Sequence, residues 1–285
     1  MTSIKIADRL NRIEQSASSL ASQKARAMRA EGRDVIALSA GEPDFATPDH
    51  VIDAAFEAAR QGQTRYTNAA GTPELKQAII AKFKRENDLD YTEDEVMAST
   101  GGKQAIFNSL VATVEAGDEV IIPAPYWISY VDITKFAGGI PVIVPCAVEN
   151  DFKLTPELLE ASITPKTRWL ILNSPSNPCG AVYSADDLRA LADVLVRYPD
   201  IAIFSDDIYE HIIYDDFEFA TIAAVAPELK DRTVTMNGAS KVYAMTGWRM
   251  GYCGAPATLV KQMTKLQQQT TGCASAISQA AAVAA

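Results

Sequence analysis

The sequence is poor in the residues that most often bind metals or form disulfides. Only two histidines occur among 285 residues, His50 and His211, so a three-histidine metal site is excluded. No motif supports a mixed-ligand site, and we expect no catalytic part for His211. The four cysteines are widely spaced and form no CxxC pair. They indicate reduced thiols and a cytoplasmic location, so we expect neither a metal centre nor a disulfide framework.

Long hydrophobic runs and excess positive charge are also missing. No stretch approaches the roughly 18 apolar residues that a membrane-spanning helix needs. The first ten residues lack the apolar core of a signal peptide. A formal net charge of −10 argues against nucleic acid or an anionic membrane surface as a partner. These absences leave a globular protein that acts on small molecules.

Short apolar runs alternate with helical or turn-rich segments along most of the chain. This alternation predicts an α/β fold with a mostly parallel sheet whose two faces are covered. We expect residues 1–47 to form an N-terminal arm and part of a small domain, and residues 48–285 to form a large domain. The expected strands lie at residues 96–99, 119–122, 140–144, 169–172, 201–204, 233–236 and 250–253.

The most informative polar residue is Lys241, which lies among small residues soon after the apolar run Thr233–Met236. A lysine amine that is shielded from water loses part of its positive charge and becomes a nucleophile toward carbonyl groups. Arg249 follows eight residues later and suits a phosphate. Most lysines are solvated surface charges, so a functional role for Lys241 depends on companions elsewhere in the chain.

Two companions follow apolar runs that resemble buried strands. Asp206 and Tyr209 come after residues 201–204, at the strand end where open α/β sheets bind ligands. Asn177 lies in a turn-rich segment after residues 169–172, and its amide can donate and accept hydrogen bonds. Without a functional role, Asp206 and Tyr209 would belong to an acidic loop, and Asn177 would belong to an ordinary turn at the end of a strand.

A third companion is the pair Gly101 and Gly102, which precedes a helical pattern. Backbone N–H groups at such a helix start can approach an anion closely. A nucleotide P-loop is disfavoured here, because Gln104 follows Lys103 where that motif needs Ser or Thr.

Seven sequence blocks in order resemble the fold-type I enzymes that use pyridoxal phosphate (PLP). Among these, the chain is similar to class I aminotransferases of the aspartate aminotransferase group, subgroup Ib. The resemblance covers nearly the whole chain. The blocks are Ser39–Phe45, Thr64–Tyr66 with Gly71, Ser99–Gln104, Pro123–Trp127, Asn173–Pro178, Ser205–Tyr209 and Ser240–Arg249.

The resemblance implies PLP as the cofactor and assigns roles residue by residue. Lys241 would carry PLP as a Schiff base and shuttle the substrate proton. Asp206 would pair with the pyridine nitrogen, and Tyr209 would contact the ring oxygen. The remaining implied contacts are Asn177 to the ring oxygen and the substrate carboxylate, Arg249 with the backbone of Gly101, Gly102 and Lys103 to the phosphate, Trp127 over the ring, and Gly41 beside the substrate.

The resemblance also implies a homodimer, in which Tyr66 reaches the phosphate of the neighbouring subunit. Lys103 has a second implied role, selection of the distal carboxylate of an acidic substrate. For Arg12, an approach to the substrate mouth and an exposed surface charge remain open alternatives. The chain departs from the group at Gly238, where some relatives have a hydroxyl residue that could bind phosphate.

The implied reaction is transamination of aspartate or glutamate with 2-oxoglutarate, and prephenate is a further substrate in some relatives. The alternatives are another amino-acid aminotransferase or a β-lyase on the same fold, and a non-catalytic PLP-binding protein. Related chains continue past Ala285 and carry an arginine there that binds the substrate α-carboxylate. If residues 1–285 were the whole protein, we would expect weak or absent transamination.

Overall fold

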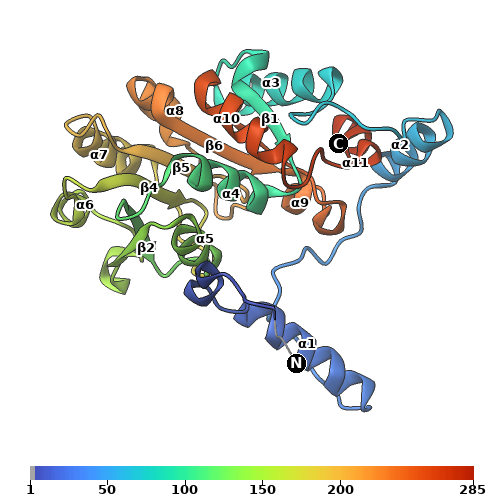
Figure 1. The fold of residues 1–285 in the computed structure, drawn as a ribbon, viewed down its shortest axis with the longest axis horizontal. Helices are drawn as coiled ribbons and strands as arrows, with labels where there is room; N and C mark the ends of the chain where they lie inside the picture. Colours follow the sequence, from blue (N-terminus) through green and yellow to red (C-terminus); the bar gives the residue numbers. More distant parts are fainter. Residues whose placement is uncertain (1–3) are drawn as a thin grey trace.

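A seven-stranded sheet forms the centre of the computed structural model, which describes residues 4–285 (Figure 1). The strand order is β1-β7-β6-β5-β4-β2-β3. Strand β7 runs antiparallel to β1 and β6, and the remaining neighbours are parallel. The predicted α/β fold with a mostly parallel sheet is confirmed. The strands are β1 (Val96–Ser99), β2 (Glu119–Ala124), β3 (Ile140–Pro145), β4 (Thr167–Asn173), β5 (Ala202–Asp206), β6 (Thr233–Gly238) and β7 (Gly251–Gly254).

Strand β4 illustrates why the strands are apolar runs. Successive side chains of a strand point to opposite faces of the sheet. Trp169 and Ile171 belong to one buried cluster, whereas Leu170 and Leu172 belong to another. Because both faces are covered, both sets of positions are apolar.

Helices cover the two faces and one edge of the sheet. Helices α4, α5 and α10 contribute to the first cluster, and α6, α7 and α8 contribute to the second. A third cluster joins α2, α3 and α11 to β1. The helices are α1 (Ala17–Ala30), α2 (Asp49–Arg60), α3 (Pro73–Asn87), α4 (Gly102–Thr113), α5 (Ser129–Ala137), α6 (Pro156–Ser162), α7 (Ala185–Leu195), α8 (Ile222–Val225), α9 (Ala239–Val242), α10 (Ala257–Gln268) and α11 (Ala276–Ala284), with short 3-10 turns η1 (Asp8–Arg12), η2 (Glu93–Glu95), η3 (Val148–Asn150), η4 (Pro227–Arg232) and η5 (Thr246–Trp248).

Helix α3 has clear local signals at both ends. Thr72 caps its start, since the hydroxyl accepts a hydrogen bond from the Leu75 N–H at 3.2 Å, and Pro73 occupies the first turn. The helix stops at Asp88, whose backbone is left-handed (φ 52°). Asn87, the last residue of α3, is buried.

Within the N-terminal arm, helix α1 makes little contact with the rest of the chain. No residue of α1 is buried, and this helix extends away from the sheet (Figure 1). Ile36 and Leu38, which follow α1, are 84% and 91% exposed. The boundary between residues 47 and 48 stays a prediction. Among residues 4–285, no helix combines the length and apolarity needed to cross a membrane.

Candidate functional site

The candidate site forms where β4 and β5 end side by side. Asp206 is the last residue of β5, and Asn173 is the last residue of β4. The Asn173 Nδ2 donates to the Asp206 backbone carbonyl at 2.9 Å. The Asn177 N–H donates to Asn173 Oδ1 at 2.7 Å. These bonds hold the loop with Asn177 against the carboxyl edge of the sheet, where ligands bind in α/β folds.

Asp206 is a buried carboxyl group with one strong side-chain partner. It is 3% exposed, and its Oδ2 accepts a hydrogen bond from Tyr130 Oη at 2.6 Å. Burial raises the pKa of Asp206 to about 6, although the Tyr130 hydroxyl and the Lys241 charge favour the ionised form. Tyr130 lies in α5, far from Asp206 in sequence, and sequence reasoning missed it because no local motif marks this contact.

Lys241 lies in the short helix α9, and its side chain reaches the backbone at Gly41. Its Nζ donates a hydrogen bond to the Gly41 carbonyl and lies 5.5 Å from the centroid of the Tyr209 ring. Burial lowers the pKa of Lys241, and Arg249 acts in the same direction against the charge of Glu42. The amine is therefore easier to deprotonate than a surface lysine.

Tyr209 lies next to both Asn177 and Gly41. The Asn177 Nδ2 donates to Tyr209 Oη at 3.4 Å. A Cβ atom built on Gly41 would lie 4.0 Å from Tyr209 Oη. The structure thus brings four predicted residues together at one place, Gly41, Asn177, Tyr209 and Lys241.

Positive groups gather at the N-terminus of α4. Gly101 precedes this helix with φ 80° and ψ 161°, and a Cβ atom there would lie 2.4 Å from Arg249 Nη2. The guanidinium therefore packs directly on the glycine backbone. Arg249 itself has a left-handed backbone (φ 54°), and its Nη1 donates to the Thr246 carbonyl at 2.9 Å. The N–H groups at the start of a helix and a neighbouring arginine make this corner suitable for an anion.

Trp127 and Lys103 flank the same corner. The Lys103 Nζ lies 4.9 Å from the centroid of the Trp127 ring, which is within cation–π range. Trp127 also packs edge-on against Tyr130, with ring centroids 5.4 Å apart. Partial burial and the charge of Arg249 lower the pKa of Lys103. These contacts fix the indole ring between the anion corner and Asp206.

Two predicted residues lie outside this group. Tyr66 is fully exposed, and its role in a neighbouring subunit stays a prediction. Arg12 is exposed, and its Nη1 lies 3.9 Å from the position of a Cβ atom on Gly138. Gly138 caps the C-terminal end of α5, whereas Trp127 precedes the N-terminal end of this helix. Arg12 therefore lies near the end of α5 that is opposite to Trp127.

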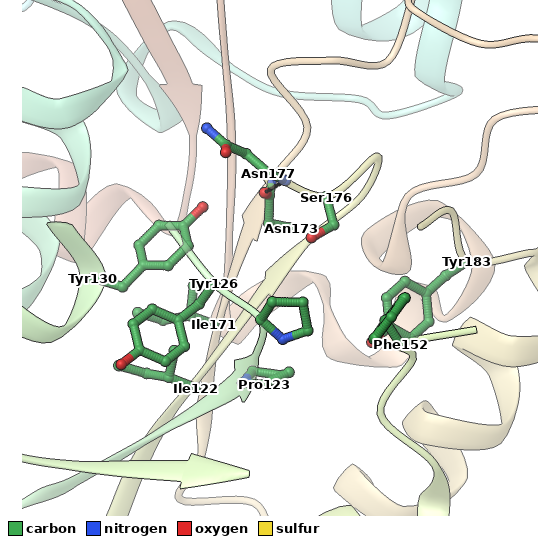
Figure 2. Close-up of a pocket in the computed structure, with 11 residues that line it drawn as sticks. Ile122, Pro123, Tyr126, Tyr130, Phe152, Ile171, Asn173, Ser176, Asn177 and Tyr183 are labelled. Carbon is green, nitrogen blue, oxygen red and sulfur yellow. Dashed lines mark hydrogen bonds between the residues drawn. The ribbon is translucent and has the colours of Figure 1, made fainter. Parts of the chain in front are cut away.

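A small cavity lies next to the candidate site and shares Tyr130 and Asn177 with it (Figure 2). Tyr126 and Tyr130 line one side, Phe152 and Tyr183 line the other, and Asn177 borders the opening. Its free space admits about one water molecule. This cavity is therefore too small for a cofactor-sized ligand.

Comparisons with known proteins agree with this geometry. A family model described as "Aminotransferase class I and II" matches residues 33–285. A Rhizobium meliloti protein named aspartate aminotransferase is 56% identical over 262 residues, covering 92% of this chain and 64% of that protein. The chain thus spans less than two thirds of that relative. A Cereibacter sphaeroides protein named aspartate/prephenate aminotransferase is 54% identical over 280 residues, covering 98% of this chain and 70% of that protein.

Solved structures are similar over almost the whole chain. The aspartate aminotransferase of Rhizobium meliloti superposes with a TM-score of 0.95 at 53% identity, covering 99% of this chain and 70% of that one. The Thermus thermophilus aspartate aminotransferase with maleate superposes with a TM-score of 0.95 at 43% identity, covering 99% of this chain and 72% of that one.

Proposed function

We propose an amino-transfer function from one premise, that the chain belongs to the family of class I and II aminotransferases. This family uses PLP. The proposed reaction moves the amino group of an acidic amino acid to a 2-oxo acid. The observation that carries the proposal is the Lys241 amine, which lies beside Tyr209 in the site that also holds Asp206.

The residues present fit PLP group by group. For the phosphate there are the N–H groups of Gly102 and Lys103 at the start of α4 and the Arg249 guanidinium, in a cradle that a Cβ atom on Gly101 would fill. For the aldehyde there is the Lys241 amine with its lowered pKa. For the ring nitrogen there is the buried carboxyl group of Asp206.

The remaining contacts complete the proposed cofactor site. Trp127 offers a flat ring for stacking on the pyridine. Tyr209 and Asn177 offer a hydroxyl and an amide for the ring oxygen. Within residues 4–285, the Tyr209 hydroxyl and the Asn177 side-chain amide share one long hydrogen bond of 3.4 Å, so each group keeps capacity for another partner.

When bound, PLP supplies an aldehyde that reacts with amines and a ring that withdraws electrons from the substrate α-carbon. Lys241 is the base that takes the proton from the α-carbon of the amino acid. Its lowered pKa leaves more of the amine neutral near pH 7, which this role needs. Asp206, when ionised, holds a proton on the ring nitrogen, and that charge pair keeps its carboxylate from being buried alone.

Acidic substrates are favoured by the cations around the site. Lys103 lies beside Trp127 with its ammonium free to meet a distal carboxylate. Gly41 leaves room for the main-chain end of the substrate, and Asn177 can donate to its carboxylate. We therefore propose aspartate or glutamate as donor and 2-oxoglutarate as acceptor. The name of the Cereibacter sphaeroides relative, which is 54% identical, adds prephenate as a further candidate acceptor.

We also propose a homodimer in which Tyr66 contributes to the phosphate site of the other subunit. The fully exposed side chain of Tyr66 and helix α1, which has no buried residue, support this proposal because both are available for contacts between subunits. We further propose that residues 1–47 form an N-terminal arm and part of a small domain, and that residues 48–285 form the large PLP-binding domain.

Borohydride reduction of the PLP-loaded protein tests the assignment. We expect one pyridoxyl adduct, at Lys241, by peptide mass mapping, and none in Lys241→Ala. An adduct elsewhere, or no adduct in the wild type, would refute the cofactor site.

A coupled assay with aspartate and 2-oxoglutarate, then with prephenate, tests the reaction. Amino transfer in the wild type and its loss in Lys241→Ala are expected. A protein that forms the adduct but transfers no amino group from any acidic donor would be a PLP-binding protein without this activity.

A further inference from the structure

Behind the candidate site, a buried polar cluster joins helix α3 to the turn that follows β5. Glu210 directly follows Tyr209, but its side chain is only 5% exposed. Its Oε2 accepts a hydrogen bond from Asn87 Nδ2 at 2.7 Å, and its Oε1 forms an ion pair with Lys82. The Lys82 Nζ also donates to Asn87 Oδ1 at 2.7 Å. The three side chains therefore form a closed triangle in the interior.

The rim of the cluster carries two more ionisable side chains. His211 Nε2 lies 3.1 Å from Glu86 Oε2 and 3.2 Å from Glu210 Oε1. Glu86, Glu210 and His211 could together ligate a cation, but the Lys82 ammonium already lies between the two carboxylates. Burial opposes the ionised form of Glu210, yet the contacts with His211 and Lys82 outweigh it and lower its pKa. The cluster is therefore an internal charge pair rather than a metal centre.

The backbone links this cluster directly to Tyr209. The Glu210 N–H donates to the Asp207 carbonyl at 2.9 Å, and the Ile212 N–H donates to the Tyr209 carbonyl at 2.8 Å. Tyr209 thus lies inside a tight turn. Glu210 anchors that turn to α3 on one side, while Tyr209 meets Asn177 on the other.

We propose that Glu210 is a positioning residue, which acts through its buried pair with Lys82 to hold the Tyr209 hydroxyl at the site. The expected effect of Glu210 on the reaction rate rests on the proposed function. The position of Tyr209 itself is a property of the chain without cofactor. If the turn loses its anchor, the phenol moves relative to Asn177 and Lys241. A displacement of about 1 Å at a reacting group can lower the rate roughly 100-fold.

The test compares Glu210→Gln with Tyr209→Phe and with the double variant. Glutamine keeps the size of the side chain and an acceptor for Asn87, but it removes the charge that pairs with Lys82. The matched control is Asp90→Asn. It removes a carboxylate from an exposed ion pair with Lys84, which lies in α3 as Lys82 does. Glu210→Asp, which keeps the charge, should restore part of any loss.

Kinetics and spectroscopy separate positioning from general stability. We expect Glu210→Gln to lower kcat/KM roughly 10- to 100-fold and to shift the pH midpoint of the bound-cofactor absorbance in the same direction as Tyr209→Phe. In the Tyr209→Phe background it should add little, because the group that it positions is already gone. Equal effects of Glu210→Gln in both backgrounds would overturn the proposal.

A second readout needs no cofactor and no activity. In 3-fluorotyrosine-labelled protein, the 19F resonance of Tyr209 is identified by its loss in Tyr209→Phe. We expect this resonance to shift in Glu210→Gln and to stay in place in Asp90→Asn. An unmoved resonance refutes the positioning role. If Glu210→Gln does not fold, Lys82→Met with Glu210→Gln removes the unpaired buried ammonium and permits the same measurement. Failure of wild type to bind PLP would instead refute the proposed function.

Discussion

Replacing Gly101 by alanine should weaken cofactor binding through two separate effects. The first is backbone strain, because φ 80° with ψ 161° is a region that is essentially restricted to glycine. The second is a collision, because the new Cβ atom would lie 2.4 Å from Arg249 Nη2. The guanidinium must then shift from its place at the start of α4, where we propose that it binds phosphate.

The two effects have different sizes and different readouts. The strain should cost about 1–3 kcal/mol of folding free energy, which lowers Tm by roughly 2–10 °C. Loss of one charge-assisted hydrogen bond to phosphate costs about 1.5–3 kcal/mol, which weakens PLP binding roughly 10- to 150-fold. Differential scanning calorimetry measures the first effect, and titration of cofactor-free protein by tryptophan fluorescence measures the second.

Gly62→Ala provides the matched control. Gly62 has the same φ of 80°, but nothing lies within 4 Å of a Cβ atom there. This variant should lose stability and keep wild-type affinity for PLP. Wild-type affinity in Gly101→Ala, or equal weakening in both variants, would refute the proposed phosphate corner.

Three further predictions concern ionisable groups. Tyr130→Phe removes the hydrogen bond to Asp206, so the pKa of that carboxyl group should rise above about 6. PLP binding should weaken roughly tenfold. Fluorescence titrations of PLP binding between about pH 5 and 8 measure both effects, and a pH midpoint equal to that of the wild type would contradict the prediction. Burial raises the pKa of Asp207 to about 7, so the folded chain retains a proton that the unfolded chain loses near pH 4. Its contribution to stability therefore falls as pH rises from about 4 to about 7, and the Tm of Asp207→Asn relative to wild type should increase over that interval; a flat difference would be inconsistent. The pKa of His211 should lie above its usual 6.5 because Glu210 and Glu86 face it, and an NMR titration should show a lower value in Glu210→Gln; no change would exclude that ion pair.

Much of the fold could be predicted because its signals are local. Each of the seven expected strands overlaps a strand of the structure, since a strand covered on both faces must be a short apolar run. The antiparallel direction of β7 could not be predicted. It depends on the path between β6 and β7, which is only the short stretch Ala239–Met250 and includes the helix that carries Lys241.

The candidate site was predicted in part. Lys241, Asp206, Tyr209 and Asn177 follow strands or lie in turns with recognisable residue types, so each could be found from its own segment. Tyr130 could not, because it is one aromatic residue in an amphipathic helix, 76 positions from the carboxylate that it meets. Sequence distance hides such contacts.

The sequence alone determined the succession of strands and helices along the chain and the residue types at the ends of the strands. Hydrophobic periodicity and turn chemistry, which carry this information, act over a few neighbouring positions. Tertiary structure decided which of these groups meet. It packs Arg249 on Gly101, buries Asp206 beneath Tyr130, and ties Glu210 to Lys82 across 128 positions of chain. Desolvation and charge pairing depend on the atoms that surround a group in space, so the shifted pKa values of the site arise only when the sheet and its helices are assembled.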